Sequence, residues 1–191
     1  MSKREEPSDK QSYTDKKGRT RWHRNDEVAA VVKQLGEYLI IGGYPENHAK
    51  RYGQLAHTIS RMPELIDTLD DNKQLGTIAG VGGIITSYIE EIVRTGTTSK
   101  FKDDQYGEPP PLSVLELTAI NNLGAMTARM LYQDHGIDSM KSLCKALAEG
   151  TLADINGIGP KMIETIAIQC CLLYTSPSPR DQRGSRMPSS A

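Results

Sequence analysis

Residues 75–82 read LGTIAGVG, and the same pattern returns as LTAINNLG at 117–124 and as LADINGIG at 152–159. Each copy has leucine first, isoleucine fourth, glycine or asparagine sixth, an apolar residue seventh and glycine eighth. Three copies with one internal spacing indicate a structural repeat. Apolar residues at helical spacing follow every copy, so the sequence predicts three tight turns that each lead into a helix.

The residue types indicate what such a turn does. Glycine, and asparagine after it, adopts a positive φ with little steric cost, so the sixth position allows a sharp reversal. The glycine at the eighth position leaves the start of the next helix uncovered. The first N–H groups of a helix have no partner within it and lie at the positive end of its dipole, where a phosphate is stabilised. We interpret the unit as a helix-hairpin-helix motif, which resembles a clamp on the DNA backbone that does not read base sequence.

The candidate DNA contacts lie at these turns and at the helix starts that follow them. They are Gly80, Gly82, Gly83, Asn122, Gly124, Ala125, Gly157, Gly159 and Lys161. The third copy has Lys161 two residues after its last glycine, whereas the first and second have Ile84 and Met126 at that place. We therefore expect the third copy to bind phosphate best. The alternative is that each unit is only a tight turn between packed helices.

The rest of the chain predicts an all-α fold with two small helical modules. Residues 1–24 show no hydrophobic period and are expected to form a disordered basic arm. The first module covers residues 25–100, begins with Asn25 as a helix N-cap and contains the first motif. Residues 101–110 have the composition of a linker, and residues 111–170 form a module with the other two motifs.

Charge is distributed unevenly along the 191 residues. Residues 1–24 have eight Lys or Arg against four Asp or Glu, whereas residues 25–170 have twelve against nineteen, a net charge of -7. A broad basic face is excluded, so DNA binding must rest on local geometry or on the basic arm. No apolar stretch approaches the roughly 20 residues of a membrane helix, so we expect a cytoplasmic protein with no membrane partner.

The cysteines and the C-terminal segment are expected to carry no chemistry. Cys144, Cys170 and Cys171 lack the spacing of metal ligands, so neither a zinc site nor a disulfide is expected, and Cys144 is interpreted as a buried apolar residue. Residues 171–191 resemble a translated sequencing-library adapter. We therefore expect no fold there, and a natural gene that continues past residue 170.

The order of several features is similar to the N-terminal region of X-family DNA polymerases, the polymerase beta-like enzymes of DNA repair, and most like their bacterial branch. These features are Tyr52, Ile59, Pro63, Gly80-Val81-Gly82, Ile89, Ile92, Thr95-Gly96 and the second and third motifs. The resemblance implies a lyase-type first module that binds the 5′-phosphate side of gapped or nicked duplex DNA. It also implies that the palm domain, with nucleotidyltransferase activity and Mg²⁺, lies downstream of residue 170.

The chain departs from the family pattern at the lysines of the lyase module. Tyr88 occupies the place of the lysine that forms the Schiff base, and a tyrosine cannot form an imine. Two lysines that hold the 5′-phosphate are replaced by Ile84 and His48, and Tyr52 is kept. We therefore expect no catalytic residue in this chain. His48 and Tyr52 are candidate phosphate contacts, the alternatives being a solvated histidine and a core tyrosine.

The family resemblance also implies a monovalent cation, Na⁺ or K⁺, held by backbone carbonyls at the hairpins. By position the carbonyls are those of Gly76, Ile78, Val81, Thr118, Ile120 and Leu123. Such an ion bridges to a DNA phosphate and helps an acidic domain accept a polyanion.

Two other functional classes fit the same residues. The chain has the features of the DNA-binding part of a structure-specific nuclease, since such enzymes also pair a helical domain with these hairpins. A helical scaffold whose hairpins pack against a protein partner is consistent with the net charge of -7 in residues 25–170.

Overall fold

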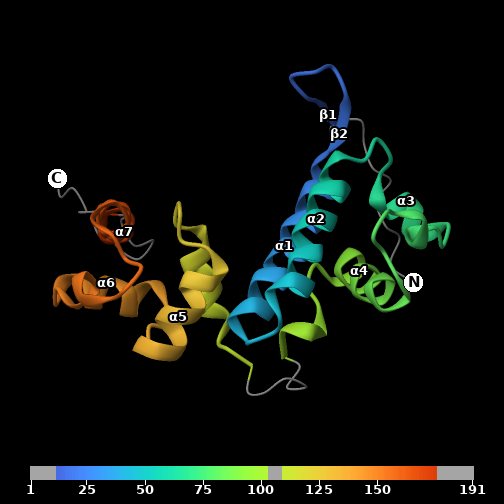
Figure 1. Cartoon of the computed structure of the whole chain (residues 1–191). Helices are drawn as coiled ribbons and strands as arrows, with labels where there is room; N and C mark the ends of the chain where they lie inside the picture. Colours follow the sequence, from blue (N-terminus) through green and yellow to red (C-terminus); the bar gives the residue numbers. More distant parts are fainter. Residues whose placement is uncertain (1–11, 103–108, 176–191) are drawn as a thin grey trace, which may run out of the picture.

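The fold is mainly helical, as expected, with one small sheet of two strands (Figure 1). We describe it from a computed structural model, which describes residues 12–102 and 109–175. The elements are β1 (Ser12–Thr14), β2 (Thr20–Trp22), α1 (His23–Ile41), α2 (Glu46–Arg61), α3 (Ile66–Asp71), η2 (Leu75–Thr77), α4 (Gly83–Thr95), η3 (Ser99–Lys102), η4 (Leu112–Ala119), α5 (Ala125–His135), α6 (Met140–Ala148), η5 (Thr151–Asp154) and α7 (Pro160–Thr175). Among the helices of these two ranges, none has both the length and the apolar character needed to cross a bilayer.

Two large apolar cores and a smaller cluster around Tyr38 and Phe101 share the long helix α1. The first core joins α1 to α2, α3 and α4 through buried residues such as Val28, Ile59 and Ile89. The second joins α5, α6 and α7, and Ile41 at the end of α1 is fully buried in it. α1 therefore runs from one group of helices into the other, with α4 and α7 on opposite sides of it (Figure 1).

The connection between the groups is also fixed by polar contacts at the end of α1. The Tyr38 hydroxyl lies 2.6 Å from the carbonyl oxygen of Phe101 and 2.9 Å from that of Pro110. Burial raises the pKa of the Tyr38 phenol. The Gln133 side chain donates to the carbonyl of Ile41 at 3.2 Å. Residues 103–108 of the expected linker lie outside the described residues.

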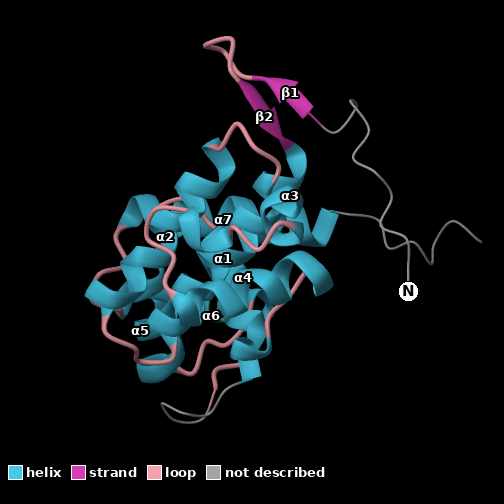
Figure 2. Cartoon of the chain, turned by 90° about the vertical axis from the view of Figure 1, so that its right-hand side faces the viewer, coloured by secondary structure: helices cyan, strands magenta, loops and turns pink. Residues whose placement is uncertain are grey.

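The expectation of a disordered arm up to residue 24 is wrong for its described part. Residues 12–22 form an antiparallel hairpin, with Tyr13 opposite Arg21, and it projects from the helical body (Figure 2). Arg21 is buried and donates to the carbonyl of Arg61 at 2.6 Å. Polar bonds of this kind hold the hairpin in place, and a search for hydrophobic periodicity does not detect them.

Asn25 does not cap α1, because that helix begins at His23 after Trp22. Its side chain is fully buried instead. It donates to the carbonyl of Glu64 at 2.8 Å and accepts the N–H of Ile66 at 2.9 Å. Asn25 thus satisfies backbone groups at the start of α3. The sequence identified it as an asparagine that bonds the backbone near a helix start, but it assigned the residue to the wrong helix.

The expectation that the chain forms no disulfide is wrong. Cys144 on α6 and Cys170 on α7 are bonded, with their Cα atoms 5.6 Å apart and a sequence separation of 26 residues. Packing of α6 against α7 brings the two residues together. The bond closes a loop that contains the whole third turn. α7 itself continues to Thr175, five residues into the segment for which no fold was expected, and residues 176–191 lie outside the described residues.

Candidate nucleic-acid interface

The three repeated stretches adopt the same backbone conformation. Their sixth residues all have a positive φ, 90° at Gly80, 67° at Asn122 and 94° at Gly157. In each turn the seventh residue donates its N–H to the carbonyl of the fourth. These bonds are Val81 to Ile78 at 3.0 Å, Leu123 to Ile120 at 3.0 Å and Ile158 to Ile155 at 3.1 Å. The repeat in sequence is therefore a repeat in structure, and its apolar positions anchor the turns in the two cores.

The helix starts after the first two turns are uncapped. Gly82 and Gly124 are the N-cap residues of α4 and α5, and neither has a side chain to bond the helix. The first bonds back to these caps come from Thr86 and Ala128, each at 2.9 Å. Within the described part of the chain, the N–H groups of residues 83–85 and 125–127 bond to no other residue. They remain available to an anion.

The third turn offers fewer amides but adds a cation. Pro160 is the first residue of α7 and has no N–H group, and Met162 donates its own to the carbonyl of Gly159 at 2.9 Å. The amide and the exposed side chain of Lys161 remain. The matching side chains at the other turns are apolar and exposed to solvent, at 73% for Ile84 and 48% for Met126.

The glycines and Asn122 of the three turns lie at the surface, where a ligand can reach the backbone. Gly80, Gly82, Gly83, Asn122, Gly124, Gly157 and Gly159 are all exposed. Ala125 differs, because its side chain is buried in the second core and only its backbone amide is available to a phosphate. Since α4 and α7 lie on opposite sides of the molecule (Figure 1), the first and third turns do not form one compact site.

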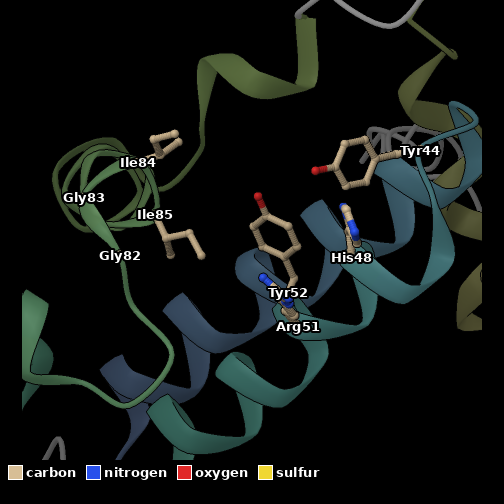
Figure 3. Close-up of a pocket in the computed structure, with 8 residues that line it drawn as sticks. All are labelled: Tyr44, His48, Arg51, Tyr52, Gly82, Gly83, Ile84 and Ile85. Carbon is tan, nitrogen blue, oxygen red and sulfur yellow. The ribbon is translucent and has the colours of Figure 1, made fainter.

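A pocket of about 340 Å³ lies between α2 and the start of α4 (Figure 3). It brings four of the expected residues together, His48 and Tyr52 from α2 with Gly82 and Gly83 from the first turn. The other lining residues are Tyr44, Arg51, Ile84 and Ile85. Tyr44 and Arg51 were not expected there. The sequence does contain an indication for Arg51, because it is one helical turn after His48 and therefore lies on the same face of the helix.

Tyr52 combines a core-packed ring with a hydroxyl group at the pocket. Its ring is half-buried and packs against the first core, and a Cβ added at Gly36 of α1 would lie only 2.8 Å from the Tyr52 Cβ. Its hydroxyl points into the space between α2 and α4 (Figure 3). His48 is exposed at the pocket edge, with its ring centroid 6.0 Å from that of Tyr44. One side of the pocket is thus formed by aromatic rings that carry polar groups.

Lysine is not among the residues that line this pocket. Tyr88 lies farther along α4, half-buried against the cluster around Tyr38 and Phe101. The group that would be needed for imine formation is thus missing from the position that the family resemblance indicates. The pocket presents a guanidinium, an imidazole, hydroxyl groups and backbone amides, which can all donate hydrogen bonds to an anion.

The backbone carbonyls expected to hold a cation lie at the first two turns. The carbonyls of Ile78 and Ile120 each accept one N–H, from Val81 and Leu123, and a second lone pair remains on each oxygen. The Thr118 hydroxyl lies 2.8 Å from the carbonyl of Leu115 and 3.1 Å from a carboxylate oxygen of Glu37. No cluster of three or more His, Cys, Asp or Glu in the described ranges is placed to hold a metal ion.

Neither a scan against models of protein families nor a search of curated proteins finds a match to this chain.

Proposed function

We propose that this chain binds the DNA backbone without sequence preference through three helix-hairpin-helix motifs. The observation that supports this most is the threefold geometry, in which one positive φ, one hydrogen bond and one exposed helix start recur at 75–82, 117–124 and 152–159. Other helices of this chain, such as α1 and α2, also begin without a side-chain cap, so the supporting feature is that the open helix start recurs after the same turn. The N–H groups of an open helix start bind a phosphate oxygen with the help of the helix dipole.

This mode of binding agrees with the acidic charge of residues 25–170. A protein that grips DNA with many lysines and arginines carries a strong positive charge. Backbone amides supply their partial charge without changing the net charge, so a chain segment at -7 can still accept phosphates locally. Base edges play no part, because amides at a turn reach the phosphates and not the groove floor.

We further propose that the first turn binds a DNA end at a gap or nick, as the N-terminal part of an X-family repair polymerase. The pocket beside this turn supports the proposal. It offers the Arg51 guanidinium, the His48 ring and the Tyr52 hydroxyl opposite the amides of the α4 start, which suits a terminal phosphate. A Na⁺ or K⁺ ion at the carbonyls of the first and second turns is part of the same proposal.

Fluorescence anisotropy tests this function. The full chain is titrated at low salt against labelled duplexes that are intact, nicked or gapped, with and without a 5′-phosphate at the gap. Tighter binding to the gapped, phosphorylated duplex is expected, with no dependence on base sequence. Absence of binding to every duplex contradicts the proposal and favours the protein scaffold, for which the exposed Ile84 and Met126 and the acidic charge are the supporting observations.

Reversing the charge of Lys161 is expected to weaken binding on all sequences alike. The side chain is exposed beside the free amide of the third turn, and the loss of one phosphate contact costs about 1 kcal/mol. Titration of Lys161→Glu against duplexes of different sequence measures this. Lys145→Glu on α6 makes the same change in net charge at a side chain that is 75% exposed, and it should bind nearly as the original chain does. A loss confined to some sequences contradicts backbone binding.

Introducing a cation at the first turn is expected to have the opposite effect. Ile84 lines the pocket and is 73% exposed, so Ile84→Lys places an ammonium there without disturbing a core. Affinity for the gapped duplex should rise about tenfold with a 5′-phosphate and less without one, since a hydrogen bond to a charged group contributes about 1.5 to 3 kcal/mol. Leu112→Lys in η4, where Leu112 is 51% exposed, is the matched control. Equal gains in both variants contradict a phosphate at this pocket.

A further inference from the structure

The β-hairpin of residues 12–22 is docked on the C-terminal end of α2. The Arg21 guanidinium donates to the carbonyl of Arg61, the last residue of α2, and pairs with the Asp15 carboxylate at 3.1 Å. The Trp22 indole N–H donates to the carbonyl of Pro63 at 2.8 Å. These contacts fix the hairpin relative to α2, so residues at its tip hold a defined place in the molecule.

The tip of the hairpin is a braced turn. The Asp15 carboxylate accepts the N–H of Lys17 at 2.9 Å and that of Arg19 at 3.0 Å, and it pairs with the Arg19 side chain at 2.8 Å. The backbone bond from Arg19 is the main reason that the pKa of this carboxyl lies well below its usual range. Gly18, with a φ of 74°, closes the turn. The braced turn presents the side chains of Lys16 and Lys17 to solvent.

Four cations on the hairpin and α2 are exposed and unmatched by acids. Lys16, Lys17, Arg51 and Arg61 form no ion pair with any residue in the described ranges. We call these four residues the basic strip. Many other exposed cations of the protein lie beside a carboxylate one helical turn away, as Lys145 does. In the described ranges Lys102, Lys141 and Lys161 are also exposed without an ion pair, whereas the basic strip places four such cations on two elements that contact each other.

The basic strip starts at the first turn. α2 has one acidic residue, Glu46, which pairs with Lys50 at 3.2 Å. Arg51 lines the pocket beside Gly82 and also a second hollow that Gln54, Leu55, Thr58, Ala79 and Gly80 complete. From there the exposed face of α2 continues to Arg61 and the docked hairpin, which projects beyond the end of α2 (Figure 1). From Arg51 to Arg61 the ten residues of α2 rise about 15 Å, and the three-residue strands of the hairpin add about 10 Å, so the path is as long as about seven nucleotide steps in one DNA strand.

We propose that the basic strip follows the sugar-phosphate backbone of the duplex that flanks the site at the first turn. The inference rests on the proposed function, because a strand held by the α4 amides runs next to Arg51. From there, phosphates at regular spacing meet Arg61 and then the lysines of the hairpin. The hairpin thus extends the footprint by about seven base pairs beyond the first turn, and it supplies positive charge that residues 25–170 lack as a whole.

The salt dependence of binding tests the strip. The original chain, Lys16→Glu/Lys17→Glu and the control Lys33→Glu/Lys145→Glu are titrated against a gapped duplex from low to moderate salt. The control has the same net charge, and its two lysines are also exposed but pair with acids on their own helices. Because each neutralised phosphate contributes about 0.9 to the slope of log affinity against log salt, the hairpin variant should lose about 1.8 of slope and about tenfold in affinity. The control should keep the original slope.

The length of the duplex arm gives an independent readout. Shortening the arm on the side of the strip below about seven base pairs should weaken the original chain and leave the hairpin variant almost unaffected. The neutral pair Lys16→Gln/Lys17→Gln should show the same slope change with less perturbation of the turn, and circular dichroism checks that each variant is folded. Equal slopes for hairpin and control variants overturn the strip while the proposed function stands. Failure of the original chain to bind any duplex overturns both.

Discussion

Replacing Asn25 with leucine is expected to lower the free energy of unfolding by about 2 to 4 kcal/mol. The asparagine side chain is fully buried and bonds the carbonyl of Glu64 and the N–H of Ile66. Leucine has a similar volume but no polar atom, so the N–H of Ile66 loses its partner in a buried position and the carbonyl of Glu64 loses its partner in a part-buried one. Each unsatisfied buried group costs about 1 to 3 kcal/mol.

Urea unfolding followed by circular dichroism measures this loss. Asn47→Leu on α2 is the matched control, because Asn47 is exposed and a surface substitution changes stability by about 0.5 kcal/mol or less. A loss of about 1 kcal/mol in Asn25→Leu is what removal of a simple N-cap produces. That result would contradict the buried role of Asn25 and support its interpretation as the N-cap of α1.

Asn25 also illustrates how much of the structure can be predicted from the sequence alone. An asparagine just before apolar residues at helical spacing predicted a helix start, and α1 begins within two residues of it. The prediction succeeds because helix formation depends on neighbouring residues. The partners of Asn25 lie 39 and 41 residues away, so no local pattern indicates them. The three turns were predicted with their glycines for the same reason as the helix, since a positive φ and a short hydrogen bond involve only neighbouring residues.

Elements held by distant contacts were missed. The β-hairpin has strands of three residues each, with little apolar character, and its anchor on α2 joins Arg21 to a carbonyl 40 residues later. The disulfide joins cysteines 26 residues apart, and only the packing of α6 on α7 brings them together. Both depend on tertiary structure, which periodicity and spacing do not encode.

The candidate site was predicted in part, unlike the three turns, which were predicted fully, and the hairpin and disulfide, which were missed. The turn residues were predicted from the repeat, and His48 and Tyr52 from the family resemblance. The structure brings His48 and Tyr52 to one pocket with Gly82 and Gly83 of the first turn, and no residue of the other two turns lines it. Tyr44 and Arg51 complete the pocket because α2 packs beside the start of α4, a relation between segments about 30 residues apart in the chain. A sequence can suggest which residues have the right chemistry, but their assembly depends on how the helices pack.

Substituting alanine for Gly80 and Gly157 together is expected to lower the free energy of unfolding by about 2 to 4 kcal/mol. Both residues have a strongly positive φ, 90° and 94°, which costs a residue with a Cβ about 1 to 2 kcal/mol. A Cβ at either position meets no atom closer than 3.9 Å, so the cost comes from the backbone and not from a clash. The two turns belong to different cores, so their costs should add.

Gly53→Ala is the control that isolates the backbone conformation. Gly53 is exposed within α2 and also has open space around its added Cβ, but its φ is helical. Alanine there should raise stability by about 0.5 to 1 kcal/mol, the opposite sign for the same chemical change. Affinity for the gapped duplex should fall in the double variant, because a turn that relaxes its φ moves the free amides of residues 83–85 away from the phosphate. If Gly80→Ala/Gly157→Ala unfolds at the original urea concentration and binds DNA as before, the positive φ does not hold these amides in place, and the repeated turn loses its connection to DNA.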